Sequence, residues 1–115
     1  MVDQTFKDAI DETRKSISRF QKIEGKEWGV EGAVIELAKQ VGELSALIMN
    51  QEGYYFSGRD KLSDKYASSQ DSIADELADI MFAVTRIVDH YDIDLVATNQ
   101  KTRKMEDEFL KTKGV

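Results

Sequence analysis

The chain has 115 residues, of which 41% are hydrophobic and 33% charged, and it contains neither proline nor cysteine. This length favours a single domain over residues 1–115, and the absence of cysteine excludes disulfides, thiolate metal sites and a cysteine nucleophile. With 16 basic and 22 acidic residues the formal net charge is −6, so we expect no nucleic-acid partner.

The lack of proline, with abundant Ala, Glu, Lys and Leu, predicts an all-α fold of long helices joined by short loops. The N-terminal stretch is charged from Asp3 onward and has no apolar signal core, and no apolar run approaches the length of a membrane span. We therefore expect a cytoplasmic protein without a membrane partner.

Two helices are predicted in the first half of the chain by apolar residues at helical spacing. The first covers roughly residues 3–22, with one face formed by Phe6, Ile10, Ile17 and Phe20. The segment IEGKEWG (23–29) breaks this pattern with two glycines. The second helix covers roughly residues 30–50 and carries a continuous apolar stripe of Val30, Val34, Leu37, Val41, Leu44 and Ile48.

The next segment, QEGYYFSGRDKLSDKY (51–66), is predicted to be an extended loop or a short irregular helix, because it combines two glycines with alternating charges. Its three adjacent aromatic residues either pack against a neighbouring subunit or contact a ligand. The sequence leaves both alternatives open.

Two further helices are predicted after this segment. One covers roughly residues 69–91, and its apolar stripe consists of Ile73, Leu77, Ile80, Met81, Val84, Ile87 and Val88. The only histidine, His90, lies at its end, where it can interact with the helix dipole. The last helix covers roughly residues 95–113 and has few apolar positions, so we expect it to lean on another element.

Acidic and amide side chains lie beside the stripes of two of these helices. Glu36, Gln40 and Glu43 are spaced i, i+4 and i+7 and share a narrow arc, and Glu76 and Asp79 lie at the edge of the later stripe. Antiparallel packing of the two helices would gather these oxygen atoms into one cluster. Oxygen-only ligands favour Mg²⁺ or Mn²⁺, whereas the alternative is an ordinary solvated helix face.

The two segments that contain these residues resemble the motifs of a known protein family. LAKQVGELSALI (37–48) and DELADIMFAVTRIVDHYDIDL (75–95) resemble the Glu-x-x-Glu and Glu-x-x-Asp motifs of the MazG-like all-α nucleoside triphosphate pyrophosphohydrolases. The resemblance covers about residues 26–105. It implies a four-helix bundle subunit that assembles into a homodimer or homotetramer.

The resemblance also implies a set of metal ligands for Mg²⁺ or Mn²⁺, which are Gln40, Glu43, Glu76 and Asp79. Gln40 departs from the pattern, because the family has glutamate there. An amide oxygen can bind a hard cation but brings no charge. Glu36, one turn earlier on the same face, is a candidate extra ligand.

The remaining implied roles concern catalysis and the substrate. Glu43 and Glu76 are the implied catalytic residues, and Lys101 and Lys104 on the last helix correspond loosely to phosphate-binding residues. Trp28 lies where the family often has an aromatic residue near the base. The alternatives are ordinary surface cations for the two lysines and a core position for the tryptophan.

The implied activity is hydrolysis of a nucleoside triphosphate between its α and β phosphates, giving a monophosphate and pyrophosphate. Because Gln40 replaces a glutamate, there is an alternative to this activity: the protein is a catalytically weakened or inactive relative that binds nucleotides or other proteins. A purely structural helical assembly also remains open. A di-metal carboxylate bundle is excluded, because the single histidine does not follow a glutamate at i+3.

Overall fold

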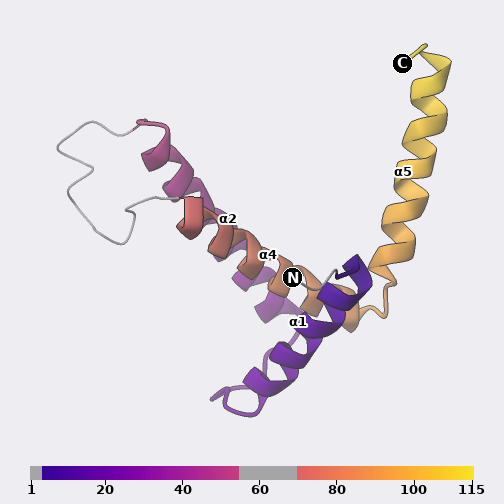
Figure 1. Cartoon of the computed structure of the whole chain (residues 1–115). Coiled ribbons are helices and arrows are strands. Elements are labelled where there is room, and N and C mark those ends of the chain that lie inside the picture. Colours follow the sequence, from indigo (N-terminus) through magenta and orange to yellow (C-terminus); the bar gives the residue numbers. More distant parts are fainter. Residues whose placement is uncertain (1–3, 55–69) are drawn as a thin grey trace.

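A computed structural model describes residues 4–54 and 70–115, and these residues form four α-helices and no strand (Figure 1). The helices are α1 (Phe6–Gln21), α2 (Val30–Gln51), α4 (Gln70–His90) and α5 (Leu95–Thr112). The predicted all-α class is confirmed, and each predicted helix is present with ends that differ by a few residues. The predicted loop at 51–66 lies largely outside the described residues, which end at Tyr54 on that side.

Local sequence signals fix several helix ends. At the start of α1, Thr5 and Asp8 form a capping box, in which each side chain accepts from the other residue's backbone N–H. The start of α5 is capped by Asp94, whose carboxylate accepts from the N–H of Ala97 at 3.0 Å. In the turn after α4, Asp92 lies in the left-handed region at φ 53°, a conformation that short polar side chains tolerate better than most.

Helices α2 and α4 run antiparallel along each other and form the main helix pair (Figure 1). Helix α1 crosses the later half of α4 in the opposite direction, because Arg14 pairs with Asp89 at 2.9 Å and Phe20 meets Phe82 edge-on at 5.9 Å. The small core between the three helices consists of Ile10, Ile17, Ala33, Leu47, Ala83 and Val88.

The face of α2 that is buried differs from the predicted stripe. Its buried residues are Ala33, Gln40 and Leu47, whereas Val34, Val41 and Ile48 remain exposed. Both sets repeat every seven residues, so they are two neighbouring lines on one helix. A single neighbour, α4, covers only one of them. The single chain therefore buries only part of the apolar surface of α2.

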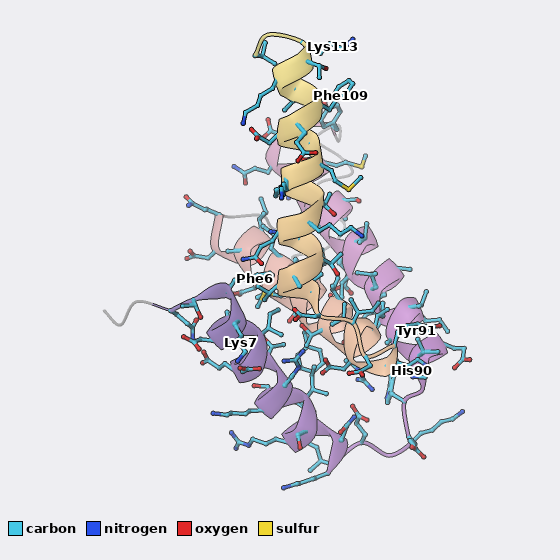
Figure 2. The ribbon with its side chains drawn as sticks, turned by 90° about the vertical axis from the view of Figure 1, so that its right-hand side faces the viewer. Phe6, Lys7, His90, Tyr91, Phe109 and Lys113 are labelled. Atoms are coloured by element: carbon cyan, nitrogen blue, oxygen red, sulfur yellow. The ribbon has the colours of Figure 1, made fainter. Side chains whose placement is uncertain are left out.

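Helix α5 stands apart from the α2–α4 pair (Figure 1). It contains no buried residue, and Met105 and Phe109 are exposed near its free end, where Figure 2 shows Phe109 and Lys113. The expectation that this helix leans on another element is not met within the described chain. Among the described residues, no helix is both long and apolar enough to cross a membrane.

Candidate functional site

The antiparallel pairing of α2 and α4 brings together three of the predicted ligands, Gln40, Glu43 and Glu76. Gln40 is only 9% exposed. With its amide nitrogen facing the acids, it donates to Oε2 of Glu43 at 3.2 Å and to Oε2 of Glu76 at 2.7 Å. The opposite orientation would direct the amide oxygen at two carboxylates. Gln40 therefore acts as a neutral bridge between two acids from different helices.

The electrostatics of this cluster centre on Glu76. Burial raises the pKa of Glu76, and the neighbouring carboxylates of Glu43 and Asp79 raise it further, while Lys39 acts in the opposite direction. Lys39 lies one turn before Glu43 on α2, and its Nζ is 3.9 Å from Oε1 of Glu43. The cluster thus holds more negative charge than its neighbours compensate, a condition that favours a cation.

The two remaining predicted ligands line a cavity beside the cluster. Asp79 lies one turn after Glu76 on α4, and Glu36 lies one turn before Gln40 on α2. Both border an open cavity of about 430 Å³, together with Lys39. All five predicted ligands are therefore on the facing sides of one helix pair, three in direct contact and two at the adjoining cavity.

The chemistry of this donor set fits a hard divalent cation, because it combines four carboxylates and an amide from two helices. Its arrangement is not a finished metal cage. In the described part of the chain, no three Asp, Glu or His side chains converge closely enough to hold a metal ion. The amide of Gln40 lies between the two acids, and it must turn over to present its oxygen to a cation.

Aromatic side chains also line the same cavity. Phe20, Trp28 and Phe82 line it, with Ile35 at its rim. The sequence predicted Trp28 near a base, but it assigned Phe20 only to a helix face and did not single out Phe82. The cavity therefore combines aromatic side chains with the acids Glu24, Glu36 and Asp79.

Arg86 is a further residue of this cavity that the sequence analysis missed. Its side chain is 8% exposed, and its Nη1 lies 3.3 Å from Oε1 of Glu24 and 3.7 Å from Oε2 of Glu36. Its guanidinium also lies 5.4 Å from the centre of the Trp28 ring. A signal was available, because Arg86 follows Asp79 by two helical turns and so shares its face of α4.

The two predicted phosphate-binding lysines are not part of this site in the single chain. Lys101 and Lys104 lie on α5, which extends away from the α2–α4 pair (Figure 1). Trp28, by contrast, lies directly at the cavity. The fold therefore brings together the implied metal ligands and the aromatic residue, but not the two lysines.

Comparisons of the chain with models of protein families, with curated proteins and with solved structures found no match.

Proposed function

We propose that the protein is a divalent-cation-dependent nucleoside triphosphate pyrophosphohydrolase that cleaves between the α and β phosphates. The observation that carries the proposal is the contact of Gln40 with Glu43 and Glu76 beside a cavity that Asp79 borders. The resemblance of both motifs to the MazG-like enzymes supports the same activity. Such a site combines oxygen ligands for a cation with space for a nucleotide.

The acidic end of the cavity is suited to the phosphates. When bound, Mg²⁺ or Mn²⁺ supplies the positive charge that neutralises and orients them. Glu76 and Asp79 from α4, with Glu43 and Gln40 from α2, would hold the cation, and Glu36 is an additional candidate. Lys39, which lines the cavity, would face the remaining phosphate charge.

Hydrolysis then needs a base for the attacking water. Glu43 is the candidate, because its side chain is a quarter exposed and so remains open to solvent. Water attacks the α phosphorus in line, and its proton passes to Glu43. The bond from the α phosphorus to the bridging oxygen breaks, pyrophosphate leaves and the nucleoside monophosphate remains.

The aromatic end is suited to the base of the nucleotide. A volume of about 430 Å³ exceeds what a nucleobase alone needs, and its planar walls from Phe20, Trp28 and Phe82 offer stacking surfaces. The substrate class that this end favours is therefore a nucleotide rather than inorganic polyphosphate.

We further propose that the active form is a homodimer or a homotetramer. A single chain leaves Val34, Val41 and Ile48 of α2 exposed, and it leaves Met105 and Phe109 of α5 exposed. A second copy could cover these faces, and its α5 could bring Lys101 and Lys104 to the phosphates. The oligomer would then complete a site that one chain builds only in part.

The competing function is that of an inactive or weakened relative that binds nucleotides or proteins. A specific observation favours it. The Gln40 amide donates hydrogen bonds to Glu43 and Glu76, so these two carboxylates have a partner without a cation. In that case the cavity would still bind nucleotides, but no reaction would follow.

The test is pyrophosphate release from canonical and modified nucleoside triphosphates, dUTP and dCTP included, with Mg²⁺ or Mn²⁺. We expect release by the wild-type protein, loss of at least 100-fold in Glu76→Gln, and unchanged activity in Asp75→Asn. Asp75 is a matched control because it is an exposed acid next to Glu76 on the same helix. No release by the folded protein across the panel would reject the enzyme and favour the inactive relative.

A further inference from the structure

We propose that Gly32 and Arg86 are positioning residues that hold the Trp28 ring as a fixed wall of the nucleotide cavity. The inference rests on the proposed function, because it assigns this wall to the nucleobase. It adds two residues that neither the motifs nor the metal ligands include. Each one contacts Trp28 by a different kind of interaction.

Gly32, in the first turn of α2, lets the Trp28 ring approach the helix backbone. A Cβ atom added at Gly32 would lie 2.5 Å from Cε3 of Trp28 and 3.2 Å from its Cδ2 and Cζ3. No side chain larger than hydrogen fits there unless the ring moves. Trp28 precedes α2 by two residues, so the ring folds back onto the helix that follows it.

Arg86 lies against the same ring from α4. Its guanidinium, 5.4 Å from the ring centre, is at cation–π distance. Glu24 and Glu36 fix the guanidinium from two further elements, the segment after α1 and helix α2. Because this arginine is almost fully buried and paired with two acids, it has little freedom to move away from the ring.

The position of the ring decides how the surrounding space is divided. Trp28 lines the nucleotide cavity of about 430 Å³ and also two neighbouring cavities of about 300 and 500 Å³. Arg86 lines the first two of these three. A ring that moved off Gly32 would change the shape of the nucleotide cavity at its aromatic end, and stacking on the base depends on that shape.

The experiment uses Trp28 itself as the reporter, because it is the only tryptophan in the chain. Fluorescence emission and acrylamide quenching are measured for wild type, Gly32→Ala and Gly42→Ala. Gly42 is the matched control: it lies in the same helix, and a Cβ added there meets nothing within 4 Å. Both changes raise helix propensity, so neither threatens the helix itself.

In the ligand-free proteins, we expect Gly32→Ala to change the emission maximum and acrylamide quenching, and Gly42→Ala to leave both as in wild type.

Titration with Mg²⁺ and the α,β-imido analogues of the canonical deoxynucleoside triphosphates and dUTP should quench wild-type emission. Gly32→Ala should weaken that binding about fivefold or more. In turnover it should raise KM and leave kcat unchanged. Arg86→Lys, which keeps the charge but loses the planar group, should weaken binding in the same direction.

Emission, quenching and KM that are equal in Gly32→Ala and Gly42→Ala would overturn the positioning role. So would the absence of any nucleotide effect on wild-type fluorescence. The proposed reaction has its own readout: nucleotide quenching without pyrophosphate release would reject the reaction and leave the positioning role standing. Pyrophosphate release with equal KM in both glycine variants would reject the positioning role alone.

Discussion

Gln40 joins the two acids at the centre of the cluster. The sequence predicted it as a ligand that offers an amide oxygen, because the resembling family has glutamate at that position. In the folded chain, with the amide nitrogen facing the acids, Gln40 donates to Glu43 and Glu76. The spacing of residues predicted correctly that these three side chains meet, since Gln40 and Glu43 share a helix face. It could not predict which end of an amide faces two acids, because that depends on the charge around it.

Glu76 provides a prediction about the metal-free protein. Burial and the acids Glu43 and Asp79 raise its pKa in the folded state, so its ionisation destabilises the fold. This cost is absent below the pKa of the unfolded chain, grows as pH rises toward the folded pKa and is complete above it. In EDTA at pH 7, Glu76→Gln should therefore be more stable than wild type, by up to about 1 kcal/mol.

Urea unfolding at pH 7 and at about pH 4 measures this difference, which should largely vanish at the lower pH. Asp75→Asn is the control, and its stability should track that of wild type at both values. A Glu76→Gln protein that is no more stable than wild type at pH 7 would show that the cluster carries no excess charge.

At the scale of elements, the predicted helices were found, and the reason is local. Apolar periodicity and the glycines between helices specify where each helix begins and ends, and caps such as Thr5 and Asp94 add to this. The buried face of α2 was not predictable in the same way. Its apolar stripe is broader than the contact with α4, and only the tertiary arrangement decides which side of a broad stripe is covered.

The uncovered line on α2 leads to a prediction about assembly. Val41 lies in the middle of this line and is 45% exposed. If a second copy covers it, a charged side chain at this position would be buried in the interface and would oppose assembly. Val41→Glu should shift the protein from an oligomer to a monomer, as measured by size-exclusion chromatography with light scattering. Ile23→Glu is the control: it also replaces an exposed apolar residue by an acid, but Ile23 follows the end of α1 and is not part of α2.

Equal masses for wild type and Val41→Glu would contradict the proposed interface. A wild-type protein with the mass of a single chain would reject the homo-oligomer altogether. Ile23→Glu should keep the wild-type mass in either case.

In the molecule as a whole, one chain does not bring together all the residues that the family resemblance implies for the site. The α2–α4 pair supplies the acids, and α1 with the segment before α2 supplies aromatic walls, but α5 carries Lys101 and Lys104 away from them (Figure 1). Sequence motifs predicted the acids because they lie on two helices that pair directly. The part of Phe20 in the aromatic wall depends on how α1 crosses that pair, which no spacing along the chain encodes. Arg86 was within reach of the spacing, because it shares a face of α4 with Asp79.

The proposed function requires the α2–α4 cluster to bind a divalent cation. Binding is tested by titrating metal-free protein with Mn²⁺. Electron paramagnetic resonance measures the concentration of free Mn²⁺ at each step of the titration. We expect wild type to bind Mn²⁺, Glu76→Gln to bind at least tenfold more weakly, Gln40→Glu to bind more tightly, and Asp75→Asn to match wild type. Equal affinity in wild type and Glu76→Gln, or no binding by Gln40→Glu, would contradict the claim.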